Sequence, residues 1–310
     1  MNKILVTGGA GFVGSSLVKH LAKDPNNFLV VVDNLLTGSE KRVNQSKNVK
    51  FIHADVNKFV DISSVFFNFS FDYVFHYAAV VGVKRTLDFP TLVLEDITGM
   101  KNVCDLCKNT GVKRLFFSSS SEVYGEPVEL PQNEHTTPLN SRLPYAIVKN
   151  VGEAFLKSYK QEYDLDYTIF RFFNTYGPMQ SKDFVVSKFI SAALKDEDIT
   201  IYGDGSQTRT FCYVDDNISA CVNAFLEDKC VNDVVNIGSD DEITVLQLAE
   251  TIIKVANSNS KIVHLPALEE GDMTRRLPDN KKMKGLLNKE PISLEDGLKE
   301  ILADPSFIIE

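Results

Sequence analysis

Tyr145 and Lys149 are four residues apart in the segment PYAIVK. Side chains at this spacing lie on one face of a helix, so the phenol and the ammonium group can reach one site. A phenol with its ordinary pKa of about 10 is a poor base at neutral pH, but a nearby ammonium group and a nicotinamide cation favour the phenolate. The pair predicts a general base that takes the proton of an alcohol while its carbon gives up a hydride.

A second polar cluster ends the apolar run in RLFFSSSSEVYGEP. Ser120, Ser121 and Glu122 follow residues typical of a buried strand. Hydroxyl groups gain little from burial, and a buried carboxylate is costly unless it is paired. We therefore expect these three side chains to face a ligand.

Glycines at positions 8, 11 and 14, in VTGGAGFVG, fit the pattern G-x-x-G-x-x-G between a strand and a helix. Glycines there allow a tight turn and close approach of a pyrophosphate to a helix N-terminus. Asp33 ends the next strand, where a carboxylate binds a ribose diol and repels a 2′-phosphate, so the sequence favours NAD over NADP. Asp55, after the third strand, is a candidate acceptor for the adenine amine.

Strands and helices alternate through the first half of the chain, which predicts a parallel, doubly wound sheet covered on both faces. The expected strands are 3–8, 28–34, 49–56, 71–79, 112–119 and 165–177, and the expected helices are 12–23, 59–69, 91–109 and 144–163. After Gly177 the rhythm changes, with two short strands about a glycine-rich turn in 199–214. We expect a nucleotide-binding part at 1–177 and a smaller α/β part at 178–310, with later segments returning to the first.

The composition of the 310 residues is that of a globular protein, with 44% hydrophobic and 24% charged residues. A net charge of −9 without a basic stripe argues against a nucleic-acid partner. No apolar run is long enough to span a bilayer, and the N-terminus has no signal-peptide pattern, which predicts a cytoplasmic protein. Cys104 and Cys107 form a CxxC motif within a helical pattern, so we interpret them as core thiols and expect no metal site.

These motifs resemble those of the extended short-chain dehydrogenases/reductases that act on nucleotide sugars. The resemblance covers almost the whole chain through TGGAGFVG, DN at 33–34, HADV, HYAA, SSSSEVYG, PYAIVK, RFFNTYGP, YGDGSQTRTFCYVDD and TRRLPDN. It implies a Rossmann-like fold, an NAD cofactor and a UDP- or GDP-sugar whose C4 hydroxyl is oxidised to a ketone. It also implies a role in making surface polysaccharide precursors.

Residue roles follow from the resemblance. Ser120 would hydrogen-bond the sugar C4 oxygen beside Tyr145, and Lys149 would bind the nicotinamide ribose. The cofactor would contact Gly8, Gly11, Phe12, Val13, Gly14, Asp33, Asn34, Asp55, Val56, Tyr77, Ala78, Ala79, Tyr145 and Lys149. The substrate would contact Asn174, Tyr202, Arg209 and Arg276, and guanidinium groups suit its phosphates.

Ser121 and Glu122 bear on the reaction that follows C4 oxidation. Similar 4,6-dehydratases carry Asp–Glu at these positions, and a serine hydroxyl is too weak an acid to replace the aspartate. The Ser–Glu pair with TRRLPD resembles UDP-glucuronate decarboxylases, in which a glutamate and an arginine flank the sugar carboxylate. The sequence favours a 4-epimerase or net 4-dehydrogenase, because C4 oxidation has a complete set of residues and no feature demands a carboxylate on the substrate.

Two further expectations complete the interpretation. The helices at 91–109 and 144–163 resemble those that form a four-helix interface in this family, which implies a homodimer or a higher homo-oligomer. A dinucleotide-binding sensor or scaffold is the non-enzyme alternative, because a fold does not fix a function. A pure binder would not need Ser120, Tyr145 and Lys149 together.

Overall fold

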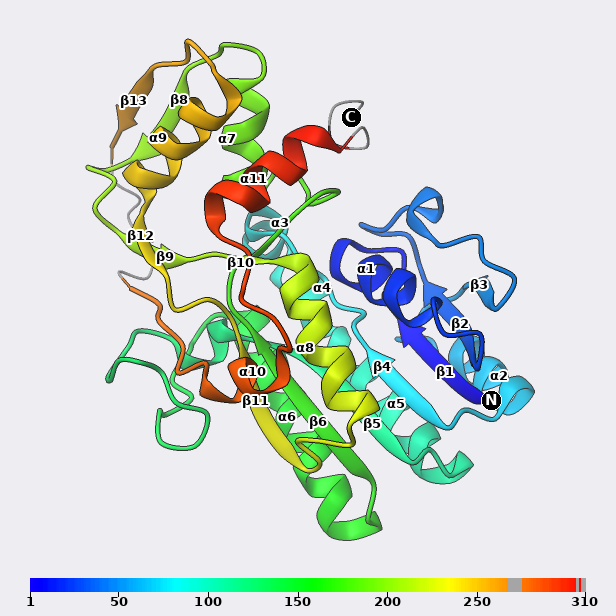
Figure 1. The fold of residues 1–310 in the computed structure, drawn as a ribbon. Coiled ribbons are helices and arrows are strands. Elements are labelled where there is room, and N and C mark those ends of the chain that lie inside the picture. The colour runs from blue at the N-terminus through cyan, green and yellow to red at the C-terminus, as the bar shows by residue number, and fades with distance from the viewer. Residues whose placement is uncertain (267–274, 305–306, 308–310) are drawn as a thin grey trace.

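A sheet of seven parallel strands forms the centre of the computed structural model, which describes residues 1–266, 275–304 and Phe307 (Figure 1). The strands lie in the order β11-β6-β5-β4-β1-β2-β3. Their bounds are β1 (Asn2–Thr7), β2 (Asn27–Asp33), β3 (Val49–His53), β4 (Tyr73–His76), β5 (Arg114–Ser120), β6 (Asp166–Phe172) and β11 (Asp233–Ile237). The order reverses between β1 and β4, the point at which doubly wound sheets bind dinucleotides. The predicted fold class is confirmed.

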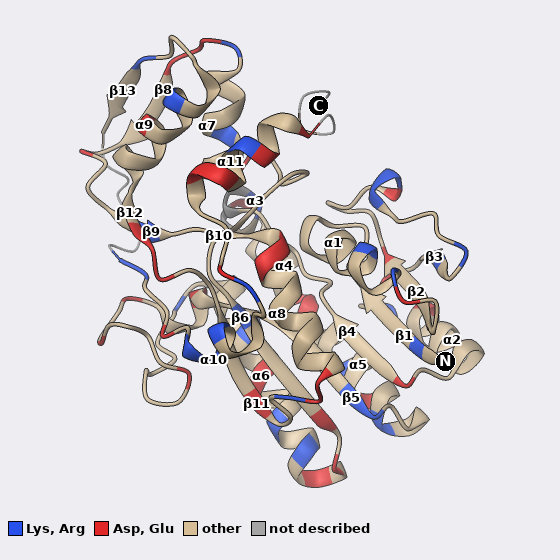
Figure 2. Cartoon of the chain, viewed as in Figure 1, with Lys and Arg blue, Asp and Glu red and all other residues tan. Residues whose placement is uncertain are grey.

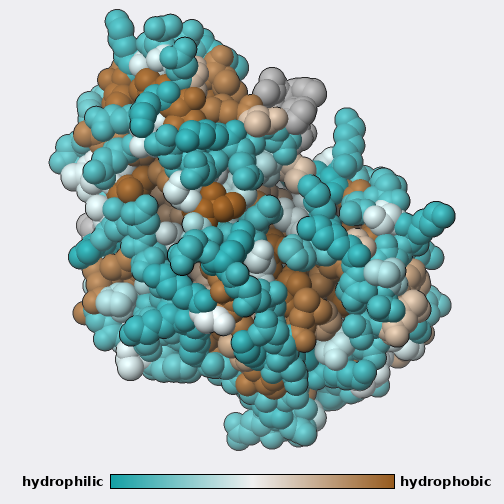
Figure 3. Space-filling view, in the orientation of Figure 1, coloured by the Kyte–Doolittle hydropathy of each residue, from teal (hydrophilic) through white to brown (hydrophobic). Residues whose placement is uncertain are grey.

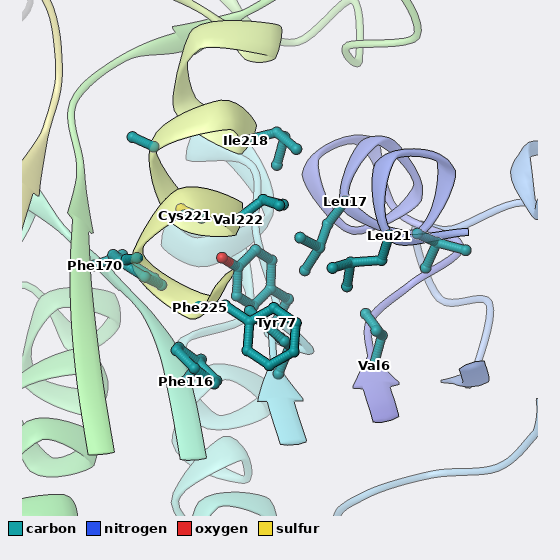
Figure 4. Packing of buried hydrophobic residues seen from close by; sticks show 14 of the residues in the cluster. Val6, Leu17, Leu21, Tyr77, Phe116, Phe170, Ile218, Cys221, Val222 and Phe225 are labelled. Carbon is teal, nitrogen blue, oxygen red and sulfur yellow. The ribbon is translucent and has the colours of Figure 1, made fainter. Parts of the chain in front are cut away.

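Helices cover both faces of this sheet, which explains why its strands are nearly continuous apolar runs. In β1, Ile4 and Val6 face α1 (Phe12–Leu21), α8 (Val214–Leu226) and α10 (Lys281–Leu286), while Leu5 faces the opposite layer. That layer contains α2 (Phe59–Phe69), α5 (Asp96–Thr110) and α6 (Pro144–Tyr163). Figure 4 shows α1 and α8 packing their apolar side chains over the strands. Each fully buried large side chain contributes roughly 1.5–3 kcal/mol.

The smaller part has its own apolar cluster, formed by α7, α9 and α11 against short strands. Its elements are β7 (Thr175–Tyr176), α7 (Val185–Ala193), β8 (Ile199–Tyr202), β9 (Thr208–Thr210), β10 (Cys212–Tyr213), β12 (Glu242–Thr244), α9 (Val245–Ala256), β13 (Ile262–Leu265) and α11 (Leu294–Ala303). β8 pairs with β13 and β9 with β12, so the glycine turn at 203–205 joins strands of two different small sheets. α8, β11 and α10 lie on the large sheet although they follow residue 177, and the division at 177 stays a prediction.

The helix expected at 91–109 is instead two helices, α4 (Pro90–Leu94) and α5, which follow the short α3 (Val83–Asp88). Asp96 opens α5, and its Oδ2 accepts a hydrogen bond of 2.7 Å from the Val80 backbone N–H. This contact fixes the start of α5 against the loop after β4, which local periodicity could not reveal. Cys104 and Cys107 on α5 are fully buried, and burial raises the pKa of both thiols, as expected of core residues.

Charged residues of both signs are interspersed over the elements seen in Figure 2. The face in Figure 3 is mostly hydrophilic, with apolar areas over α9 and beside α8. Among the described residues, no helix has the length and apolar character needed to cross a bilayer.

Candidate active site

Ser120 is the last residue of β5 and caps the short 3₁₀ helix η2 (Ser121–Tyr124). Another short 3₁₀ helix, η1 (Glu40–Arg42), follows β2. The Oγ of Ser120 accepts a hydrogen bond of 3.2 Å from the Glu122 backbone N–H. The preceding Ser119 turns to the other side of the strand and donates to Glu153 Oε1 on α6 at 2.6 Å. Alternation along β5 thus separates a serine that anchors the strand from one that faces the site.

Tyr145 and Lys149 come from the first turns of α6, which begins with Pro144 at a position where its missing N–H costs nothing. The Ser120 hydroxyl lies close enough to the Tyr145 phenol to lower the pKa of that phenol. Lys149 Nζ donates to the Ser118 carbonyl at 2.6 Å and lies 5.7 Å from the centre of the Tyr145 ring. The structure therefore brings together the three residues predicted to oxidise an alcohol.

Burial controls the pKa values of this group. Burial, with a smaller contribution from the Glu122 carboxylate, raises the pKa of Tyr145 well above its ordinary value, while the Ser120 hydroxyl acts against this. Burial also lowers the pKa of Lys149 to about 8, although the Asp96 carboxylate partly offsets it. The raised pKa of Tyr145 favours the neutral phenol, and further positive charge beside the ring would favour the phenolate.

Glu122 on η2 forms an ion pair with Arg276, in the segment that precedes α10. Arg276 Nη2 and Glu122 Oε1 are 2.7 Å apart. Arg276 is only 7% exposed, so its guanidinium group is largely withdrawn from water. Glu122 Oε2 is buried and has no hydrogen-bond partner among the described residues. Because an unsatisfied buried carboxylate oxygen is costly, the pair is suited to receive a further polar group. Thr274, the first residue of the TRRLPDN motif, lies outside the described residues.

The glycine loop between β1 and α1 fits a dinucleotide. Gly8 has φ of +71°, and a Cβ there would lie 2.5 Å from the Ala78 nitrogen. A Cβ on Gly14 would lie 2.1 Å from the Gly8 oxygen. No described side chain caps α1, whose N-terminal cap is Gly11, so its first N–H groups are available to an anion. The next residues, Phe12 and Val13, open the helix.

Asp33 ends β2 beside this loop. Its Oδ2 accepts from the Ala10 N–H at 3.0 Å and its Oδ1 from the Leu35 N–H at 2.8 Å, which holds the carboxylate at the mouth of the glycine loop. A carboxylate can accept further hydrogen bonds, so a ribose diol can still bind. Asn34 and Asp55 follow the ends of β2 and β3, and Asp55 Oδ1 caps the Asn57 N–H at 2.9 Å.

Ala78 touches the glycine loop through its backbone, which places the segment Tyr77–Ala79 at the same sheet edge. The Tyr77 side chain, however, enters the core cluster under α8, with its hydroxyl toward Cys221 (Figure 4). Only the backbone of Tyr77 is therefore left to face a ligand. Val56 follows β3 and packs in the opposite core layer.

The proposed substrate residues come from segments on both sides of residue 177. Asn174 donates through Nδ2 to the Thr210 carbonyl at 2.9 Å, which joins the segment after β6 to β9, the strand that carries Arg209. Tyr202 ends β8 and is 39% exposed, with Lys188 Nζ 5.8 Å from its ring centre. These roles stay predictions, because they depend on the bound substrate.

Sequence reasoning missed the buried ion pair behind the site. Arg171 Nη2 and Glu153 Oε2 are 2.6 Å apart, and each side chain is 1% exposed. Arg171 interrupts the apolar strand TIFRFF, which was a usable signal, because a charge inside a buried strand needs a partner.

A parallel sheet with a glycine loop at its switch point, and with a serine, a tyrosine and a lysine beside it, defines a dinucleotide-dependent enzyme of the dehydrogenase type. A sequence model described as the NAD dependent epimerase/dehydratase family matches residues 4–238. The chain belongs to this family, and its cofactor is NAD.

Relatives of this chain differ in their reactions. It is 37% identical to "UDP-glucuronic acid decarboxylase 1" of Danio rerio, over 97% of this chain and 72% of the relative. It is 36% identical to "UDP-N-acetyl-alpha-D-glucosaminuronate decarboxylase" of Bacillus cytotoxicus, over 97% and 96%. A crystal structure of UDP-glucose 4-epimerase with UDP-glucose from Thermotoga maritima superposes with a TM-score of 0.91 at 34% identity, covering 97% of both chains.

We expect the apo protein to bind NAD at least about 100-fold more tightly than NADP, because like charges brought together cost several kcal/mol. Asp33→Asn keeps one of the two acceptor oxygens of the loop and removes the charge, and should narrow the ratio of NAD to NADP affinity to about 10-fold or less. Titration calorimetry of both cofactors measures this. Equal affinities in the wild-type protein would show that Asp33 does not face the ribose.

Proposed function

We propose that this protein oxidises C4 of a UDP-sugar uronic acid, that the resulting 4-keto acid loses CO₂, and that C4 is then reduced again. The observation that carries this proposal is the ion pair between the buried Arg276 and the partly buried Glu122, which lies two residues after Ser120, the serine that would face C4. A guanidinium group there offers a fork-shaped partner for a carboxylate at C6. The decarboxylase relatives support the same assignment.

In the first step Tyr145 accepts the C4 hydroxyl proton, while Ser120 orients that oxygen. Bound NAD would take the C4 hydride and later return it. Lys149 would hold the cofactor ribose and supply positive charge near the phenol. Gly8 and Gly14 let the pyrophosphate approach the backbone at the α1 N-terminus, and Asp33 would bind the other ribose.

Loss of CO₂ then follows from the chemistry of a β-keto acid. The C5–C6 bond breaks, its electron pair moves toward the C4 oxygen, and the resulting enolate takes a proton from solvent water at C5. Ser120 and Tyr145 donate hydrogen bonds to that oxygen as negative charge develops on it. Arg276 holds the carboxylate in place before the bond breaks, and the nearby Glu122 disfavours a second negative charge, which favours release of neutral CO₂.

A 4-epimerase is the second candidate. It uses the same Ser120, Tyr145 and Lys149 but returns the hydride to the other face of the sugar, and the close likeness to a UDP-glucose 4-epimerase structure favours it. A net 4-dehydrogenase, which releases the ketone, also shares the first step. In either case Arg276 would bind the diphosphate or a sugar hydroxyl.

A panel of UDP- and GDP-sugars, including glucose, uronic acid and heptose derivatives, tests these reactions with and without added NAD. We expect UDP-glucuronate or its N-acetylated relative to lose CO₂ without net reduced cofactor, as shown by mass spectrometry and absorbance. An isobaric product without net reduction would replace the proposal by a 4-epimerase. A product lighter by two hydrogens with reduced cofactor would indicate a dehydrogenase, and loss of water would contradict our interpretation of Ser121.

The protein is expected to form a homodimer through α4, α5 and α6. Exposed apolar side chains are present on α4 and α6 at Leu94, Ile147 and Tyr163, with exposures of 43%, 41% and 48%, and burial of such groups would stabilise an interface. Ile147→Asp should convert the dimer to a monomer in light scattering at micromolar concentration. Val60→Asp on α2, at a 79% exposed apolar position, is the matched control and should leave the dimer intact. A wild-type monomer would contradict this prediction.

A further inference from the structure

Tyr124 is the last residue of η2, two positions after Glu122, and is 1% exposed. Its hydroxyl accepts a hydrogen bond of 2.8 Å from Arg171 Nη1 and donates one of 2.7 Å to Asn236 Oδ1. Burial raises the pKa of Tyr124 to about 12, so the group stays a neutral phenol that can serve both partners. The hydroxyl is therefore a junction between β6 and β11.

On one side of this junction the hydrogen bonds lead to the catalytic helix. Arg171 binds both oxygens of Glu153 at 2.8 and 2.6 Å, and Glu153 Oε1 also accepts from Ser119 at 2.6 Å. Glu153 lies one turn after Lys149 on α6, and Ser119 immediately precedes Ser120. Ser120 and Glu122 are thus held in a short stretch whose two ends, Ser119 and Tyr124, are tied to the same buried ion pair.

On the other side the hydrogen bonds lead to the segment that carries Arg276. The Asn236 side chain donates to the carbonyls of Gln132 and Asp279 at 2.8 and 3.3 Å. Gln132 in turn exchanges backbone hydrogen bonds with Leu277, at 2.7 Å, and Asp279, at 2.8 Å. The backbone directly after Arg276 is therefore fixed to Asn236, and through it to Tyr124.

We propose that Tyr124 is a positioning residue that, through Asn236, sets Arg276 against Glu122 across the sugar-binding site. The inference rests on the proposed function, because it assigns Arg276 to the substrate. The two members of the ion pair come from segments more than 150 residues apart, and their 2.7 Å contact needs both segments in register. Small errors in the placement of such groups are costly for binding and turnover.

Tyr124→Phe in the NAD-loaded enzyme tests this. We expect affinity for UDP-glucuronate, measured by calorimetry, to fall about 10-fold, because phenylalanine removes the hydroxyl that accepts a hydrogen bond from the charged Arg171. NAD affinity should change by less than about 2-fold. In an Arg276→Gln background the same substitution should change UDP-glucuronate affinity by less than about 2-fold, since nothing remains to be positioned. A purely structural role would give the same loss in both backgrounds, and that result, or no loss in the wild-type background, would overturn the proposal.

Tyr159→Phe is the matched control, because Tyr159 is also a buried tyrosine. Its hydroxyl donates a hydrogen bond of 2.6 Å to Asp105 Oδ1, which is not one of the proposed site residues. The Tyr159→Phe substitution should leave both affinities unchanged. If Tyr124→Phe does not fold, Asn236→Asp removes the two amide donors but keeps the acceptor for Tyr124, and should reproduce the pattern.

Hydrogen exchange of the NAD-loaded protein tests the link without a nucleotide sugar, so failure of the proposed function leaves this test standing. Tyr124→Phe should speed exchange of the Asp279 amide, which is bonded to the Gln132 carbonyl, by at least about 10-fold relative to the amides of α1. Unchanged exchange at Asp279 would show that Tyr124 does not hold this segment.

Discussion

Replacing Tyr145 with phenylalanine should remove hydride transfer and leave cofactor binding nearly intact. The ring packs with Val80, Val93 and Val148, so phenylalanine keeps the contacts that hold α6 in place. It lacks the oxygen that accepts the alcohol proton, and general base catalysis is worth about 10²- to 10⁴-fold. We expect the single-turnover rate, followed by absorbance of the reduced cofactor, to fall by about this factor, with NAD affinity within about 2-fold.

Two comparisons sharpen this prediction. Tyr163→Phe removes a hydroxyl from an exposed tyrosine of the same helix and should leave the rate unchanged. Lys149→Ala should weaken both turnover and NAD binding, because it removes the buried ammonium group beside Ser118. Turnover near the wild-type level in Tyr145→Phe would show that another group is the base.

The sheet could be predicted from local sequence because each strand has a strong apolar signal and each helix a clear period. Helix α6 begins at Pro144 and ends at Tyr163, as its sequence indicated. The break at Glu95 between α4 and α5 could not be predicted, because it depends on the contact of Asp96 with Val80 from a distant loop. The partners of β8 and β9 were likewise missed, because strand pairing across many residues leaves no trace in local periodicity.

In the candidate site, too, some features could be predicted from the sequence and others depend on tertiary contacts. The spacing of Tyr145 and Lys149 predicted that they share one helix face, and the family resemblance implied that Ser120, at the end of a strand, lies beside Tyr145. The sequence did not predict that Lys149 holds the Ser118 carbonyl, or that burial raises the pKa of Tyr145 in the ligand-free protein. Both depend on how deeply neighbouring elements cover the group, which is a tertiary property.

Arg276→Gln should cause the second large loss, specifically with a uronic acid substrate. The substitution removes the cation that would hold the carboxylate and leaves the partly buried Glu122 carboxylate without this ion-pair partner. We expect kcat/KM for CO₂ release from UDP-glucuronate to fall at least about 100-fold. Mass spectrometry of the product in timed reactions provides the measurement.

Arg275→Gln is the matched control, because it makes the same change one residue earlier. Arg275 pairs with Glu242 at 2.6 Å, and its side chain is 47% exposed, so we expect less than about 2-fold change. Glu122→Gln combined with Arg276→Gln separates lost binding from the unpaired charge. If the double variant regains folding stability but not CO₂ release, the arginine acts on the substrate. If Arg276→Gln instead releases CO₂ at the wild-type rate, the carboxylate is bound elsewhere, and the 4-epimerase becomes the better assignment.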